Sequence, residues 1–192
     1  MLLERSMIGN MNKPVIIYVT GAPGSGKTTL ARRISEQLYI PHISSDLVHG
    51  GVRFTLGEPN DRYKTLHEAF VPVMIDTAKR GISFVVDHVL QKDMSKADVI
   101  DKLSPHARII FIHTVAANPI KRHLERELGR DDKGKVLDDD NLKKRADFHA
   151  SNLSQTVEPA DFETPVLIVD TDDGYNPALD EIIATIERFS EE

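Results

Sequence analysis

One glycine-rich segment has the residue types and the spacing that phosphate binding requires. Residues 21–28 read GAPGSGKT, which fits the pattern G-x-x-x-x-G-K-[ST]. The glycines let successive backbone N–H groups turn toward phosphate oxygens. Lys27 can reach the β- and γ-phosphates of a nucleotide, and the Thr28 hydroxyl can bind Mg²⁺. We therefore expect a P-loop that binds ATP with Mg²⁺, rather than a glycine-rich turn with a chance lysine.

Two aspartates follow short segments that are predicted to be strands. Asp46 follows the run 42–45, and Asp87 follows the run 84–86. In a parallel sheet the carboxyl ends of the strands line the ligand crevice. There Asp46 could accept a proton from an attacking hydroxyl or position that hydroxyl, unless it only caps the next helix. Asp87 is predicted to hold Mg²⁺ directly or through water, with an ordinary turn aspartate as the alternative.

The acceptor of a transferred phosphate would lie beside these strand ends. We expect the loops over residues 47–65 and 88–96 to select it, although no pattern there names a substrate. A surface position for Arg53 and a structural role for His88 remain alternatives to acceptor binding. The predicted acceptor contacts are Asp46, Arg53, Asp87 and His88.

Three arginines recur at intervals of four residues and therefore share one helix face. They are Arg122, Arg126 and Arg130. Guanidinium groups can stabilise charge on a transferring phosphoryl group or stack on a base. Arg126 and Arg130 are the better candidates for catalysis. Glu125 and Glu127 lie between them, so a solvent-facing helix with ion pairs is the competing interpretation.

Apolar β-branched runs alternate with helical patterns along the chain. Runs without polar alternation predict strands buried on both faces, and their alternation with helices predicts a parallel sheet between two helical layers. The charged segment over about 129–145 is either a solvated loop or a lid. The predicted strands are 15–19, 42–45, 84–86, 108–112 and 166–169, and the predicted helices are 28–38, 61–80, 93–103, 118–129 and 177–189.

Composition narrows the classes of protein to consider. The 192 residues carry a formal net charge of −6, which argues against a nucleic-acid partner. The chain has no cysteine, so it has no disulfide and no thiolate, as is common in the cytoplasm. No apolar run approaches the length of a membrane span. We predict a flexible leader over residues 1–12 and one cytoplasmic domain over 13–192.

With these residues assembled, the chain resembles the small P-loop kinases, a superfamily that includes adenylate, shikimate, gluconate and zeta-toxin-like kinases. The stretches 45–47 and 78–90 are most similar to the chloramphenicol phosphotransferase-like branch, in which an aspartate after the second strand serves as base. The resemblance implies an α/β, three-layer P-loop NTPase fold. It also implies five parallel strands in the order 2-3-1-4-5, ATP with Mg²⁺, an arginine-bearing lid, and residues 170–173 beside the adenine.

We therefore predict an ATP-dependent kinase that transfers the γ-phosphate to a hydroxyl of a small molecule. The alternatives are a hydrolytic ATPase or GTPase, an ATP-binding regulator or toxin-like protein, and a nucleic-acid 5′-hydroxyl kinase. The predicted catalytic residues are Lys27, Asp46, Arg126 and Arg130, and the predicted metal ligands are Thr28 and Asp87. The predicted nucleotide-binding residues are Gly21, Ala22, Pro23, Gly24, Ser25, Gly26, Lys27, Thr28, Thr29, Arg122, Arg126 and Thr171.

Overall fold

The computed structural model describes four stretches of the chain and a few single residues. The stretches are 13–57, 66–91, 95–128 and 166–191. The predicted leader over 1–12 lies outside the described residues, as does the predicted lid over 129–145 apart from Lys144. Arg130 therefore lies outside the described residues as well.

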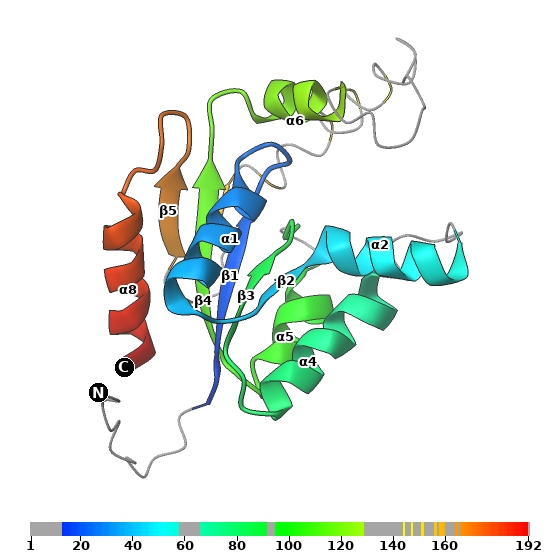
Figure 1. The fold of residues 1–192 in the computed structure, drawn as a ribbon, viewed down its shortest axis with the longest axis vertical. Coiled ribbons are helices and arrows are strands. Elements are labelled where there is room, and N and C mark those ends of the chain that lie inside the picture. Colours follow the sequence, from blue (N-terminus) through cyan, green and yellow to red (C-terminus); the bar gives the residue numbers. More distant parts are fainter. Residues whose placement is uncertain are drawn as a thin grey trace.

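Five parallel strands form the centre of the protein, in the order β2-β3-β1-β4-β5 (Figure 1). This is the predicted order 2-3-1-4-5, so the predicted fold class is confirmed. The carboxyl ends of all five strands therefore meet at one edge of the sheet. The strands are β1 (Val15–Gly21), β2 (His42–Ser44), β3 (Phe84–Asp87), β4 (Arg108–Val115) and β5 (Val166–Asp170).

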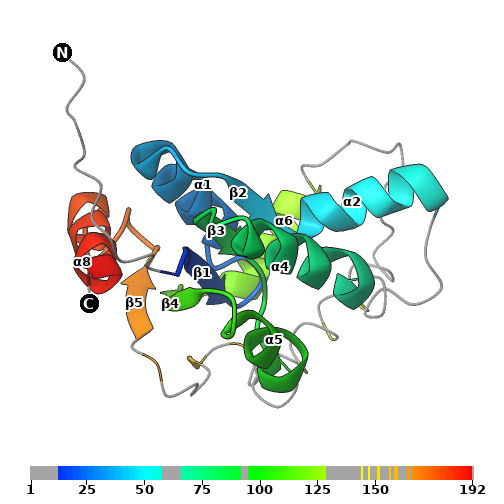
Figure 2. The same ribbon diagram turned by 90° about the horizontal axis from the view of Figure 1, so that it is seen from below.

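Helices cover both faces of the sheet (Figure 2). Those of the described residues are α1 (Lys27–Leu38), α2 (Ser45–Leu56), α4 (Val71–Lys79), α5 (Asp101–Leu103), α6 (Pro119–Leu128) and α8 (Leu179–Glu191). Single π-helical turns, η1 (Leu66–Phe70) and η2 (Lys96–Ile100), precede α4 and α5. Within the part of the chain that the structure describes, no helix is long and apolar enough to cross a bilayer.

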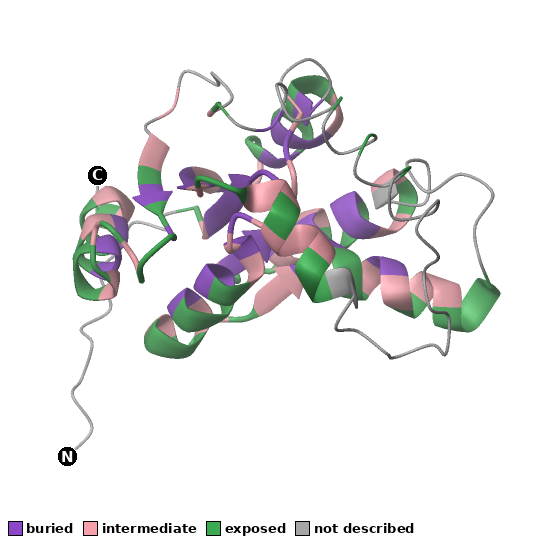
Figure 3. Cartoon of the chain, turned by 90° about the horizontal axis from the view of Figure 1, so that it is seen from above, coloured by how far each residue is buried: buried purple, intermediate pink, exposed green. Residues whose placement is uncertain are grey.

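The side chains of β1 alternate between two apolar cores. Ile17 and Val19 pack with the inner faces of α1 and α8, whereas Ile16 and Tyr18 pack with α4 and α5. All four are 2% exposed or less, as expected for a central strand without polar alternation. Figure 3 shows the buried residues along the strands and on the inner sides of the helices.

The segment after β2 differs from the prediction. We expected a loop from residue 47 to residue 65, but Ser45–Leu56 forms α2, which packs against η1. Gly50 and Gly51 hid this helix, because each glycine costs roughly 1 kcal/mol in a helix interior. The predicted helix 61–80 is described from Leu66 onward and consists of η1 followed by α4.

Candidate active site

The P-loop connects the end of β1 to the first turn of α1. Gly24 and Gly26 both have φ of +86°, a backbone conformation that side chains other than glycine rarely adopt. The Ser25 hydroxyl is buried and lies 2.6 Å from the Thr114 hydroxyl of β4, whose Oγ1 also donates to the Thr20 carbonyl oxygen. The neighbouring strand thus holds the loop in its turned shape before any ligand arrives.

Lys27 lies at the centre of the site. Its Nζ donates a hydrogen bond to the Ala22 carbonyl oxygen at 2.8 Å, across the base of the loop. Burial lowers the pKa of the ammonium to about 8; the charge of Arg126 adds to this, whereas Asp87 and Asp46 oppose it. These three charged partners, Asp87, Asp46 and Arg126, show that β3, α2 and α6 converge on the P-loop lysine. An ammonium has three N–H donors, so the bond to Ala22 leaves others for a phosphate.

A hydroxyl and a carboxylate meet beside Lys27. Thr28 Oγ1 donates to Asp87 Oδ2 at 2.6 Å, so both predicted metal ligands lie at one point of the sheet edge. Among the described residues, no cluster of three acidic or histidine side chains could hold a metal by itself. Mg²⁺ suits such a site, because it binds one or two protein oxygens together with phosphates and water. The residues present therefore fit a metal that arrives with a nucleotide.

Two predicted acceptor contacts lie on the side of the sheet edge where α2 begins. Asp46 is exposed in the first turn of α2, and Arg53 is half-buried near the end of that helix. The Asp46 carboxylate acts electrostatically on Lys27, which places it near the phosphate end of the site. The N-cap of α2 is Ser44, without a side-chain cap hydrogen bond, so Asp46 does not cap the helix, and its catalytic role stays a prediction.

His88 lies directly after β3 and packs against the Phe70 ring of η1, with 5.3 Å between ring centroids. Its backbone N–H donates to the Val19 carbonyl oxygen, which extends the pairing of β3 with β1. Burial lowers the pKa of its imidazole to about 4; the charges of Lys27 and His67 add to this effect, and Asp87 opposes it. His88 is therefore neutral at physiological pH and can both donate and accept a hydrogen bond.

The helix α6 brings its arginines to the opposite side of the P-loop. Arg122 donates to the Thr171 carbonyl oxygen at 3.3 Å and to Thr171 Oγ1 at 3.2 Å, and it lies 3.4 Å from Asp172 Oδ1. Thr171 Oγ1 donates in turn to the Ser25 carbonyl oxygen at 3.0 Å. The structure thus brings Arg122, Thr171 and the P-loop together, as predicted for the nucleotide-binding set.

Arg126 is exposed one turn further along α6. Its guanidinium lies 3.2 Å from His123 Nδ1, and its charge reaches Lys27. Glu125 pairs with Lys121 across one helical turn, at 3.9 Å. Glu125 is therefore paired with Lys121 rather than with Arg122 or Arg126, and both arginines act toward the P-loop side of α6.

His42 is a site residue that the sequence patterns did not indicate. His42 belongs to β2, the strand beside β3, and its Nε2 lies 2.6 Å from Asp87 Oδ1. The sequence offered one hint of this role. His42 lies two residues before Ser44, and alternate residues of a strand share one face. Nothing in the sequence indicated that this face points at Asp87.

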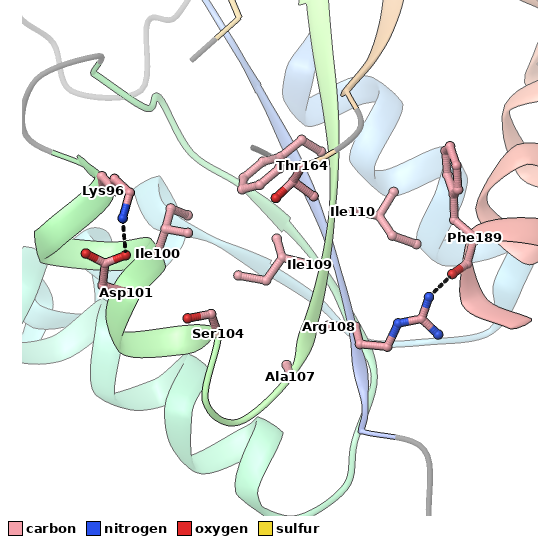
Figure 4. Close-up of a pocket in the computed structure, with 11 residues that line it drawn as sticks. Lys96, Ile100, Asp101, Ser104, Ala107, Arg108, Ile109, Ile110, Thr164 and Phe189 are labelled. Carbon is pink, nitrogen blue, oxygen red and sulfur yellow. Dashed lines mark hydrogen bonds and ion pairs between the residues drawn. The ribbon is translucent and has the colours of Figure 1, made fainter. Parts of the chain in front are cut away.

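A hollow of about 360 Å³ lies elsewhere, at the amino end of β4 (Figure 4). Ile109 and Phe111 line its wall, and the Lys96–Asp101 ion pair of 2.8 Å stands at its side. Arg108 pairs in register with Val15, the first residue of β1, whereas the P-loop follows the last. The hollow is lined by none of the predicted site residues that the structure describes, so it is separate from the phosphate site.

Comparison with known proteins supports this assignment of the P-loop. Residues 20–138, more than half of the chain, match a family model described as an AAA domain. The chain belongs to the AAA domain family. A probable gluconokinase of Schizosaccharomyces pombe is 26% identical over 197 residues, covering 96% of this chain and 95% of that protein.

Solved structures show how widely this AAA domain fold is shared. A candidate kinase from Chloroflexus aurantiacus superimposes with a TM-score of 0.71 at 21% identity, over 95% of this chain and 98% of that one. A gluconokinase from Sinorhizobium meliloti gives a TM-score of 0.57 at 19% identity, over 94% and 95%. The resemblance to small P-loop kinases is confirmed, whereas the chloramphenicol phosphotransferase-like branch stays a prediction.

Proposed function

We propose that this AAA domain protein is an ATP-dependent kinase that transfers the γ-phosphate of ATP to a hydroxyl of a small molecule. The supporting observation is that two carboxylates act on the same P-loop ammonium. Asp87 accepts a hydrogen bond from Thr28, the other proposed metal ligand, and Asp46 lies in the first turn of α2. A hydrolytic P-loop protein needs the first carboxylate, whereas a kinase also benefits from a second one beside its acceptor.

In the proposed reaction, Asp46 orients the acceptor hydroxyl and takes its proton. The acceptor oxygen forms a bond to the γ-phosphorus while the bond from that phosphorus to the β–γ bridging oxygen breaks, and ADP leaves. Lys27 and Arg126 stabilise the negative charge that spreads over the phosphoryl oxygens, and Arg130 is proposed to join them. The P-loop N–H groups hold the phosphates in line for this transfer.

Thr28 and Asp87 would hold Mg²⁺, which neutralises charge on the β- and γ-phosphates when bound. On the nucleotide side, Arg122 and Thr171 are proposed to border the base, since they hold the chain after β5 against the P-loop. Arg53 and His88 are proposed to contact the acceptor. Sugar acids are the first acceptor class to test, because a relative of matching length is named as a probable gluconokinase.

The test is ADP release with Mg²⁺ and pooled acceptors, namely sugar acids, sugars, nucleosides and antibiotics. Asp46→Asn should lower acceptor-dependent turnover by about 10²–10⁴-fold, the usual contribution of a general base. Asp76→Asn is the matched control, because Asp76 is an exposed aspartate of α4. Lys27→Ala should abolish turnover.

Three results would redirect the assignment. If no pool raises ADP release and Asp46→Asn leaves the basal rate unchanged, the protein is a hydrolase. Tight ATP binding without any turnover would instead indicate a regulator. Transfer to the 5′-hydroxyl of an oligonucleotide, but not to any small molecule, would identify the nucleic-acid kinase.

A further inference from the structure

His42 is a largely buried imidazole that none of these proposed roles uses. In the pairing of β2 with β3, His42 lies opposite Val85 and Ser44 lies opposite Asp87. The imidazole spans this two-residue offset, and its Nε2 lies 2.6 Å from Asp87 Oδ1. The two side chains are 11% and 5% exposed. The His42 side chain thus reaches along the strands to a residue that is not its backbone partner.

The two oxygens of the Asp87 carboxylate have different donors. Oδ2 accepts from Thr28 Oγ1, and Oδ1 faces His42 Nε2, each at 2.6 Å. Burial alone would raise the pKa of Asp87, but the hydrogen bonds from His42 and Thr28 outweigh it and hold the pKa below its ordinary value. Ser44, which lies opposite Asp87 in the pairing of β2 with β3, also forms a side-chain hydrogen bond with this carboxylate. An ionised carboxylate only accepts hydrogen bonds, so Nε2 of His42 carries the proton.

We propose that His42 is a positioning residue that fixes the orientation of the Asp87 carboxylate for the metal of the nucleotide complex; this rests on the proposed function. A carboxylate held at both oxygens cannot turn its plane. Mg²⁺ demands near-ideal octahedral geometry, so a turned carboxylate binds it poorly. Residues that orient metal ligands typically change metal affinity by about 10–100-fold. The pairing of β2 with β3 would hold Asp87's backbone without any histidine, so the imidazole works on the orientation of the carboxylate, together with the hydrogen bonds from Thr28 and Ser44.

The experiment measures metal binding without turnover. Mn²⁺ replaces Mg²⁺, and its free fraction is followed by electron paramagnetic resonance as the protein is titrated in the presence of ADP. His42→Leu should raise the Mn²⁺ dissociation constant about 10–100-fold. His42→Gln, whose amide N–H extends nearly as far as Nε2, should restore it to within a few-fold of the wild-type value. His106→Leu, in the turn before β4, is the matched control.

A second measurement separates orientation from general structural damage. ADP binding in EDTA should be the same for the wild type, His42→Leu and His42→Gln. In an Asp87→Asn background, His42→Leu should cause no further loss of Mn²⁺ affinity, because the histidine acts only through the carboxylate. If His42→Leu does not fold, His42→Asn, which is too short to reach Oδ1, takes its place with the same expectation.

The proposal is overturned if Mn²⁺ affinity in the variant without a donor stays within about three-fold of the wild type. It is equally overturned if metal-free ADP binding falls in parallel with Mn²⁺ binding. The kinase assignment fails separately: a wild-type protein that binds Mn²⁺ with ADP but phosphorylates no acceptor would lose the proposed function while His42 keeps its role.

Discussion

Gly24 of the P-loop lies directly against Pro119, the first residue of α6. A Cβ atom built on Gly24 would come within 1.8 Å of the Pro119 carbonyl oxygen and 2.9 Å of the His123 backbone nitrogen. The glycine is therefore required by the neighbouring helix as well as by its own φ of +86°. The phosphate-binding loop and the arginine-bearing helix are therefore in direct contact at Gly24 and Pro119.

Gly24→Ala should therefore weaken ATP binding by at least about 10-fold and lower the Tm. The left-handed backbone alone costs roughly 1–2 kcal/mol with a side chain, and the overlap with Pro119 adds to that cost. Gly81→Ala is the matched control, because Gly81 has φ of +74° and no described atom within 4 Å of its Cβ position. That control bears only the cost of the left-handed backbone, so its Tm should fall less than that of Gly24→Ala. In a chain of this size each kcal/mol of lost stability lowers the Tm by about 2–4 °C. Equal losses in the two variants, measured by calorimetry, would show that Pro119 does not restrict the loop.

The sequence predicted the parts of the protein that local patterns encode. Continuous apolar runs predicted four of the strands, a weaker pattern over 42–45 predicted β2, and the GAPGSGKT segment predicted the loop between β1 and α1. The strand order came from the family resemblance, because which strands become neighbours is decided by long-range packing. The helix α2 was missed, since Gly50 and Gly51 weaken its local signal while its packing on η1 stabilises it.

Contacts between distant residues could not be predicted in the same way. Thr28 and Asp87 were each assigned to a metal from their own motifs, and the structure adds that they touch. His42 and Thr114 belong to no motif, and their roles arise only because β2 and β4 place them beside the P-loop region. Side chains whose partner lies on another strand leave no periodic trace in the sequence.

ATP binding should weaken as the pH rises through about 8. Burial, with Arg126 adding to it, lowers the pKa of Lys27 to that value, so the free protein loses the ammonium above it. Because polyphosphate prefers the charged lysine, the ATP dissociation constant should rise by up to about 10-fold per pH unit above pH 8. Isothermal titration calorimetry between pH 7.5 and 9.5 checks this. Lys27→Met should bind weakly with no such slope, and a wild-type affinity that is constant over this range would refute the assignment.

His88 should make the protein less stable in mild acid. Burial beside Phe70 lowers the pKa of His88 to about 4, whereas an unfolded histidine titrates near 6.5. Between these values the unfolded chain binds more protons, so the free energy of unfolding falls as the pH falls from 6.5 to 4. Because the ring is only partly buried, we expect this loss to be roughly 1–3 kcal/mol.

Urea unfolding at pH 7, 6 and 5 measures that loss. His88→Gln should remove this part of the pH dependence, whereas His106→Gln, away from the sheet edge, should retain it. The lowered pKa of Asp87 stabilises the fold, and this contribution is lost mainly below the ordinary pKa range of an aspartate, so it does not interfere. Parallel pH profiles for the wild type and His88→Gln would show that the imidazole is not held neutral.

Arg122 should matter for the nucleotide base more than for its phosphates. Its hydrogen bonds hold Thr171 and the Asp172 side chain beside the P-loop, in the segment proposed to border adenine. Arg122→Ala removes these bonds, which should weaken ATP binding about 5–10-fold, since a typical bond contributes about 1 kcal/mol. The affinity for inorganic tripolyphosphate, which has no base, should change by less than about two-fold. Lys121→Ala is the matched control, because the exposed Lys121–Glu125 pair of 3.9 Å contributes little. Equal weakening for ATP and tripolyphosphate would instead place the Arg122 guanidinium on the phosphates, and Arg122 would then join Lys27 and Arg126 in stabilising the transferred group.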